Sequence, residues 1–202
     1  MVSSITWLVM LAVFSGLSMN LILQFGLGLR GIAFDENIGR EKLLAASGVL
    51  FAAVMILWLI FVFIRSVLFL GLLEYIALFP VSFLVFSVLE CLVNRFILRQ
   101  SAERGAAVLF GDALTGGVLA GAALFITLNV ADKLYEALVL SLGFSCSAAL
   151  VFVVVGEIRR RAEMEPVPRW LRGGPLALIA MGLLSLVFTS GALMLFGVLG
   201  VQ

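Results

Sequence analysis

Six long apolar stretches make up most of this chain and leave little sequence for anything else. They cover residues 5–27, 43–64, 69–94, 106–129, 134–156 and 175–200. A helix needs about 20 mostly apolar residues to cross a bilayer, so each stretch is long enough to be one membrane span. We therefore predict an all-α integral membrane protein, folded as a single membrane domain over residues 1–202.

Composition excludes the other broad classes of protein. The chain is 63% hydrophobic and 12% charged, whereas soluble domains are about 45–50% apolar and about 25% charged. A net charge of +1, without a basic stripe, argues against a nucleic-acid partner. Histidine is absent, and Cys91 and Cys146 lie in separate apolar runs without metal-site spacing. We expect no metal site and no self-contained active site in this chain.

The distribution of positive charge predicts the topology. The links after the first, third and fifth predicted helices contain 11 of the 13 Lys and Arg residues, and only Arg65 and Lys133 lie elsewhere. Because Lys and Arg are enriched in cytoplasmic loops, we place these three links in the cytoplasm and both termini outside.

The charged link around residues 95–104 divides the chain into two sets of three predicted helices, residues 1–98 and 104–202. An odd number of spans in each half predicts a 3+3 inverted repeat, a design that places a transport pathway between interrupted helices. We expect interruptions in helices one and four, with break candidates at Gly26, Gly28, Gly116 and Gly117. The alternative is that Gly117 and Gly121 form a GxxxG motif that only brings two helices close together.

Polar residues inside the predicted spans are candidates for an ion path, because a buried charge in a membrane usually faces a partner or a water-filled route. The candidates are Glu74, Glu90, Asp112, Asn20 and Thr115. Each carboxylate also has a structural interpretation. Glu74 fits a headgroup-level carboxylate, Glu90 a partner for Arg95 or Arg99, and Asp112 a helix cap.

The link between the last two helices is the most distinctive segment. It carries Arg159, Arg160, Arg161, Arg169, Trp170 and Arg172 around two prolines. These residues suit a topology anchor with the indole at headgroup level, a stiff turn that docks a partner, or a contact with anionic lipid.

The same segment resembles a known family. The runs Glu157-Ile-Arg159, Val167-Pro168-Arg-Trp-Leu171-Arg172-Gly173 and Leu178-Ile179-Ala-Met-Gly182-Leu183 are similar to the ending of the membrane subunits shared by the Rnf complexes and the sodium-pumping NADH:quinone oxidoreductase, the RnfA/RnfE and NqrD/NqrE family. Further matches cover Tyr135 to Gly143, Phe86 to Glu90 and, more weakly, Asn20 to Gly28.

The resemblance implies a six-helix inverted-repeat subunit that pairs with a paralogue of opposite orientation. The predicted topology and the ending at Gln202 are closer to the RnfA/NqrE side of that pair. In the family, cysteines of the broken first and fourth helices hold a [2Fe–2S] cluster that relays electrons between flavin and iron–sulfur subunits. Here Leu29 and Val118 occupy those positions, so we expect no cluster in this chain, with flavin and iron–sulfur groups confined to partner subunits.

Two functions follow as hypotheses. The first is a membrane subunit of an Rnf- or Nqr-like translocase in a bacterial inner membrane, which contributes structure and a path for Na⁺ or H⁺. The second is a freestanding transporter or permease on the same 3+3 scaffold, either alone or as a homodimer. The breaks in helices one and four line the path in both hypotheses.

Overall fold

The structure is a computed structural model, and it describes residues 4–25, 40–67, 73–96, 113–164 and 174–198. All regular secondary structure in these ranges is helical. Five of the described segments are long and apolar enough to cross a membrane, and a sixth apolar stretch, Gly116–Val130, is shorter. The chain is therefore an integral membrane protein built from helices, as its apolar stretches predict.

The first predicted helix is interrupted, and the others are continuous over their described lengths. The interrupted helix consists of α1 (Ser4–Val13), a π-helical turn η1 (Phe14–Ser18) and a short α2 (Leu21–Phe25). The remaining helices are α4 (Arg40–Val67), α5 (Leu73–Phe96), α6 (Ala113–Val130), α7 (Leu134–Met164) and α8 (Gly174–Val198).

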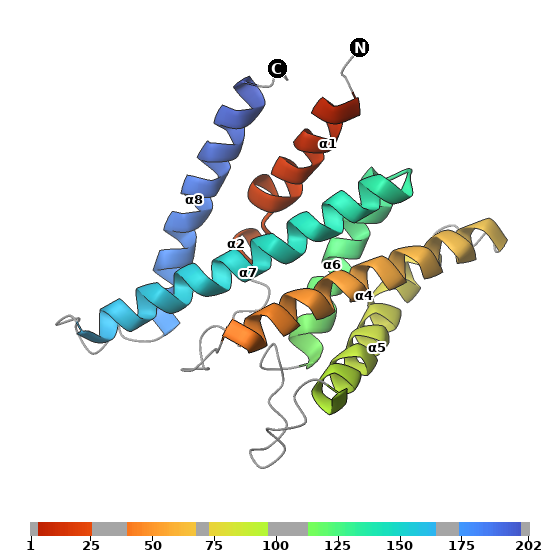
Figure 1. Ribbon diagram of the computed structural model, residues 1–202, viewed down its shortest axis with the longest axis horizontal. Helices are drawn as coiled ribbons and strands as arrows, with labels where there is room; N and C mark the ends of the chain where they lie inside the picture. The colour runs from red at the N-terminus through yellow and green to blue at the C-terminus, as the bar shows by residue number, and fades with distance from the viewer. Residues whose placement is uncertain (1–3, 26–39, 68–72, 97–112, 165–173, 199–202) are drawn as a thin grey trace.

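Successive helices alternate in direction through the bundle (Figure 1). The start of α1 and the end of α8 lie at the same end of the molecule, as an even number of spans requires. The 31 residues of α7 have a length of about 46 Å at 1.5 Å per residue. This exceeds a hydrocarbon core of about 30 Å, so its charged last turns extend beyond the apolar region.

The two sets of three helices are interleaved and do not form separate units. The interrupted helix packs against α7 and α8 from the second half of the chain, while α6 packs against α4 and α5 from the first half. The two longest helices, α4 and α7, pack against each other between these groups. Each half therefore contributes its opening helix to the other half.

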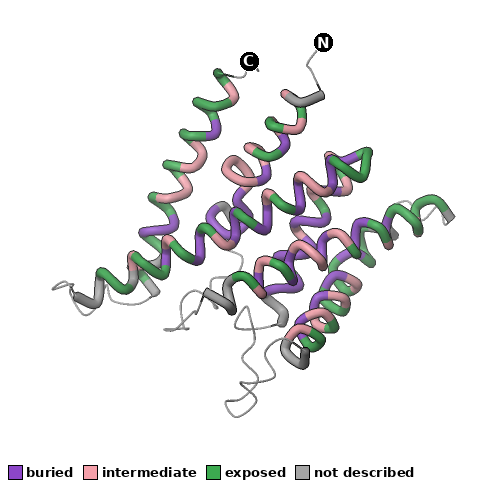
Figure 2. Tube along the Cα trace, viewed as in Figure 1, coloured by how far each residue is buried: buried purple, intermediate pink, exposed green. Residues whose placement is uncertain are grey.

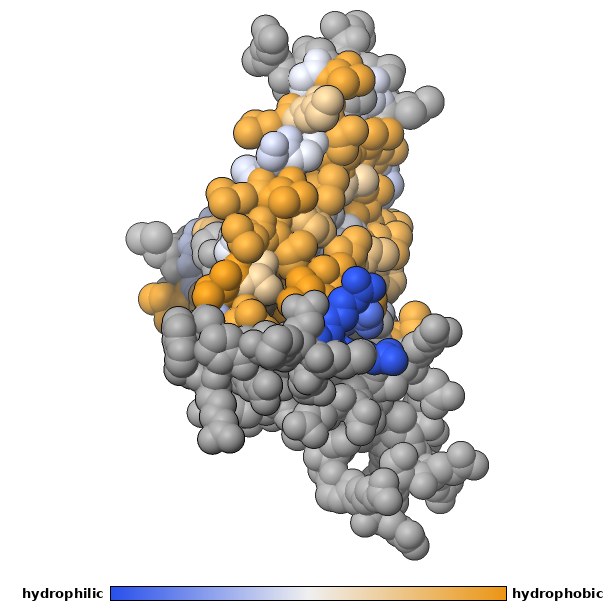
Figure 3. Space-filling view, turned by 90° about the vertical axis from the view of Figure 1, so that its left-hand side faces the viewer, coloured by the Kyte–Doolittle hydropathy of each residue, from blue (hydrophilic) through white to orange (hydrophobic). Residues whose placement is uncertain are grey.

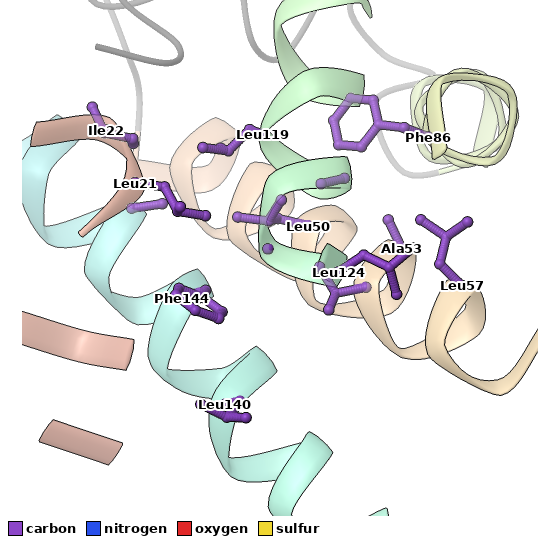
Figure 4. Packing of buried hydrophobic residues seen from close by; sticks show 14 of the residues in the cluster. Leu21, Ile22, Leu50, Ala53, Leu57, Phe86, Leu119, Leu124, Leu140 and Phe144 are labelled. Carbon is purple, nitrogen blue, oxygen red and sulfur yellow. The ribbon is translucent and has the colours of Figure 1, made fainter. Parts of the chain in front are cut away.

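The core lies where these crossings meet. Figure 4 shows side chains from α2, α4, α5, α6 and α7 in this region, among them Leu21, Leu50, Phe86, Leu124 and Phe144, all of which are buried. In the apolar window of α7 50% of the residues are buried, compared with 22% in α5 and 17% in α8. Figure 2 shows the same contrast along the chain. Thus α7 is the central helix, and α5 and α8 are peripheral.

On the face shown in Figure 3, the surface of the described residues is mostly hydrophobic. A small hydrophilic patch lies at the lower edge of this described surface. At the end of α7, the described side chains of Glu157, Arg160 and Arg161 are exposed, and Arg161 Nε lies 3.0 Å from Glu157 Oε1. This distribution fits a protein whose sides face lipid and whose ends reach water.

The predicted interruption at Gly116 and Gly117 is wrong for the described part of the fourth helix. The helix α6 continues through both residues. A methyl group on Gly116 would overlap the Phe86 ring, and one on Gly117 would lie 2.9 Å from the α carbon of Phe83. These glycines therefore allow α6 to approach α5 closely, which is the alternative role that the GxxxG motif indicated.

Candidate functional site

The interruption of the first helix lies deep in the bundle. The turn η1 contacts α7 and α8, and α2 contacts α6, α7 and α8. The Met19 N–H donates to the Phe14 carbonyl at 2.7 Å, which closes the wide turn, and Met19 then leaves the helical conformation at φ −104° and ψ 50°. Turns of this π type are frequent at functional sites. Gly26 and Gly28 lie outside the described residues, so the break that the structure describes precedes them in the sequence.

Asn20 restarts the helix after this break. Its Oδ1 accepts the N–H groups of Ile22 and Leu23, both at 3.2 Å, so Asn20 is the N-cap of α2. Exposed backbone N–H groups are costly in a membrane because no water is there to pair with them. The capping bonds therefore explain how a broken helix is tolerated at this depth.

The capping bonds also determine which side-chain atom of Asn20 can bind a ligand. Asn20 is 1% exposed, and its Oδ1 accepts two hydrogen bonds, whereas its Nδ2 has no hydrogen-bond partner within the described part of the chain. An amide nitrogen is a donor only. Asn20 therefore presents a donor at the break, and its oxygen is not free to bind a cation.

Ser15 and Gly143 form a close contact between the interrupted helix and α7. Ser15 is fully buried, and its hydroxyl donates to the Leu11 carbonyl at 2.9 Å. Any side chain on Gly143 would overlap the Ser15 hydroxyl group. On the opposite side of α7, the Ser145 hydroxyl donates to the Ser47 carbonyl of α4. The central helix is therefore held on two faces by serine contacts that the sequence analysis did not identify.

A second connection joins the same two helices near their beginning. The Trp7 indole donates to Glu136 Oε1 at 3.3 Å, while Glu136 Oε2 accepts the N–H groups of Asp132 and Lys133 at 3.0 and 3.4 Å. Glu136 thus caps α7 and connects α1 to α7.

Lys133 and Tyr135 interact beside this cap. The Lys133 ammonium lies 5.6 Å from the centre of the Tyr135 ring, and hydrogen bonding to Tyr135 raises the pKa of Lys133.

Glu90 is the one predicted carboxylate whose side chain the structure describes. It is 5% exposed and lies on α5, one turn beyond Phe86. Because Phe86 packs at Gly116 and the two helices run in opposite directions, Glu90 lies level with the start of α6 at Ala113. Asp112 and the side chains of Glu74 and Thr115 lie outside the described part of the chain.

The residues present do not fit an iron–sulfur cluster held in the manner of the family. Val118 has no ligand atom and is 41% exposed on α6, and Leu29 lies outside the described residues. Cys91 and Cys146 are exposed on two different helices, α5 and α7. Within the described ranges no group of three or more His, Cys, Asp or Glu side chains could hold a metal ion.

The basic link is described only at its beginning. Arg160 and Arg161 are exposed at the end of α7, whereas Arg169, Trp170 and Arg172, like the Arg159 side chain, lie outside the described residues. Its roles in docking and lipid contact remain predictions.

These features define the class of the protein. It is a polytopic α-helical membrane protein with a capped helix break inside its bundle. No protein-family model matches the chain.

Proposed function

We propose that this chain is a membrane subunit of an Rnf- or Nqr-like ion-translocating electron-transport complex. Its role is to provide structure and a path for Na⁺ or H⁺, without an iron–sulfur cluster of its own. The observation that carries the proposal is the break at Asn20, where a capped interruption lies among α6, α7 and α8. Interrupted helices of this kind commonly form the ion sites of transporters.

The pairing of helices supports a 3+3 inverted repeat. If the first three helices are exchanged with the last three, the contact of the interrupted helix with α8 corresponds to the contact of α6 with α5. In the same exchange, the contact of the interrupted helix with α7 corresponds to that of α6 with α4, and the α4–α7 contact maps onto itself. A pseudo-twofold axis between α4 and α7 accounts for all three relations.

The proposed path uses the buried carboxylate Glu90 and the break at Asn20. Glu90 supplies a buried carboxylate level with the start of α6. The candidates Asp112 and Thr115 lie next to that start in the sequence. Glu74 is a further candidate near the beginning of α5. A buried carboxylate can bind Na⁺ or carry a proton, and its burial is costly unless such a role or a partner offsets it.

The proposed partners follow from the hypothesis of an Rnf- or Nqr-like complex. They are a paralogous membrane subunit of opposite orientation, and flavin- and cluster-bearing subunits at the two faces of a bacterial inner membrane. The positive charge of the first, third and fifth links supports cytoplasmic placement of those links and external termini.

A freestanding transporter is the second candidate function. One specific observation favours it: the described chain lacks the thiolates that an electron relay through the subunit would need. In that case the break serves a solute, and the chain acts alone or as a homodimer.

Native purification separates the two functions. We would extract the membranes gently, capture the chain by a C-terminal tag and identify the co-purifying proteins by mass spectrometry. Flavin- and cluster-bearing subunits in the eluate would support the complex, whereas the chain alone or with copies of itself would support the transporter.

The role of Glu90 is tested by Glu90→Gln, which removes the charge and keeps the size. We expect ion-dependent activity to fall about tenfold or more while membrane expression stays normal, since one lost ion ligand or proton carrier is commonly worth over 1.4 kcal/mol. Glu157→Gln is the control, because Glu157 is exposed and pairs only one turn away with Arg161. Unchanged transport in Glu90→Gln would leave Glu90 with a structural role alone.

A further inference from the structure

The interrupted helix and α7 run in the same direction and keep a common register. Trp7 meets Glu136 at one level, and Ser15 meets Gly143 at a deeper level, eight and seven residues further along their respective helices. The next turn of each helix therefore brings Asn20 and Ser147 to the same depth. This depth is close to the middle of the apolar span Leu134–Ile158 of α7.

Ser147 lies on the side of α7 that faces the interrupted helix. It follows Gly143 by four residues, and residues four apart share one face of a helix. Ser145, which contacts α4, lies on the opposite side. Thus Ser147 is directed toward the elements that Gly143 already contacts, namely the turn η1 and the break that follows it.

Asn20 and Ser147 share an unusual property. They are 1% and 4% exposed, and both Asn20 Nδ2 and Ser147 Oγ lack a hydrogen-bond partner among the residues that the structure describes. Burying either polar atom without any hydrogen-bond partner would be costly, because the atom loses its bonds to water and gains none in return. Two such atoms, at one depth on two contacting elements, point to a shared small polar ligand.

We propose that one water molecule is bound between Asn20 Nδ2 and Ser147 Oγ. The water oxygen accepts a hydrogen bond from Asn20 Nδ2. The water also forms a hydrogen bond with Ser147 Oγ, which can act as donor or acceptor. Buried waters make about two to four such bonds, so these two partners are enough to hold one.

This water site has a consequence for transport that does not depend on the identity of the complex. The Asn20 oxygen is engaged in capping and only a donor faces the site, so an entering cation contacts water or backbone carbonyl oxygen, and not Asn20. The break is thus a hydrated point inside the membrane.

Hydroxyl-radical footprinting of the full chain in lipid nanodiscs tests the site directly. A brief X-ray exposure makes radicals from nearby water, and methionine sulfur reacts rapidly with them. Met19 directly precedes Asn20 in the sequence. Met55 on α4 is the matched control, because both methionine side chains are partly buried. We expect Met19 to be oxidised faster than Met55, because radicals form from the water bound beside Met19. Equal rates would overturn the proposal.

A pair of serine variants provides the second test. Ser147→Ala removes one side of the site, and Ser141→Ala is the control because the Ser141 hydroxyl is buried but satisfied by the Leu138 carbonyl of its own helix. With water bound, Ser147→Ala lowers both Met19 oxidation and the thermal midpoint relative to Ser141→Ala. If the hydroxyl group is simply unpaired, Ser147→Ala raises the midpoint instead, and that result overturns the proposal even if both variants express equally well.

Discussion

The hydroxyl group of Ser15 occupies the space directly over the α carbon of Gly143, so that the interrupted helix and α7 touch where a larger residue cannot fit. The contact lies just before the break and fixes the depth at which the break meets the central helix. Three predictions test this and related contacts between helices, and a fourth tests the absence of a bound cluster.

Gly143→Ala should separate the interrupted helix from α7. The added methyl group overlaps the Ser15 hydroxyl group and would lie 2.8 Å from Ser15 Cβ, so rotation of the buried hydroxyl group alone does not relieve the overlap. Overpacking of this kind costs about 1–3 kcal/mol. Thermal unfolding in detergent would show a lowered midpoint. Gly156→Ala in the same helix is the control, since its methyl group meets nothing within 4 Å, and it should be neutral or stabilise by up to about 1 kcal/mol. Equal effects of the two changes would contradict the close contact.

Gly117→Ala should have a similar effect between α5 and α6. Its methyl group would lie 2.9 Å from the α carbon of Phe83, so the two backbones must move apart. The same shift stretches the interhelical bond in which the Ser82 hydroxyl donates to the Gly117 carbonyl at 3.2 Å. We expect a loss of about 1–3 kcal/mol in an unfolding titration. Gly182→Ala on α8, where the space is open, supplies the reference value, and a Gly117 variant as stable as this reference would disprove the prediction.

The bond between Trp7 and Glu136 should couple α1 to the beginning of α7. Glu136→Ala removes both the helix cap and the acceptor for the indole, at a cost of about 1–2 kcal/mol. Trp7→Phe removes only the donor. A double-mutant cycle should give a coupling energy of about 0.5–1.5 kcal/mol. Additive effects would mean that Glu136 acts on α7 alone.

The purified chain should be colourless and free of iron. Cys91 and Cys146 lie on different helices and are exposed, and Val118 offers no ligand atom, so the chemistry of its side chains does not fit a bound cluster. Visible absorption and metal analysis of the chain separated from partners would check this. Stoichiometric iron would show that other ligands replace the missing thiolates.

The membrane spans were predictable because hydropathy alone determines them. The predicted 134–156 helix lengthens to Leu134–Met164 because charged residues that end a hydropathy window do not end a helix. The sequence indicated Asn20 as a polar residue on an ion path, and that role stays a prediction. The structure shows Asn20 as the N-cap of α2, a position that its short amide favours over a helix interior.

Other parts of the candidate site carried no usable signal. A glycine permits both a helix break and a close contact between helices, and the sequence alone does not distinguish the two. At Gly116 and Gly117 the structure shows a close contact, with Phe86 and Phe83 packed against them. Ser15, Ser147 and Glu136 were missed because single polar residues in or beside an apolar run give no periodic pattern. Ser15 and Glu136 matter through contacts with residues far away in the sequence, Gly143 and Trp7, at separations of 128 and 129 residues.

The interleaved packing has a consequence for biosynthesis. The interrupted helix makes its principal contacts with α7 and α8, which are synthesised more than 100 residues after it. At about 5–20 residues per second, the interrupted helix waits roughly 10–30 s for these partners. Throughout that interval η1 lacks the two later helices that it contacts, and α2 has its contact with α6 but not those with α7 and α8. Lipid, the insertion machinery or an assembly factor must cover the rest of the break until α8 is made.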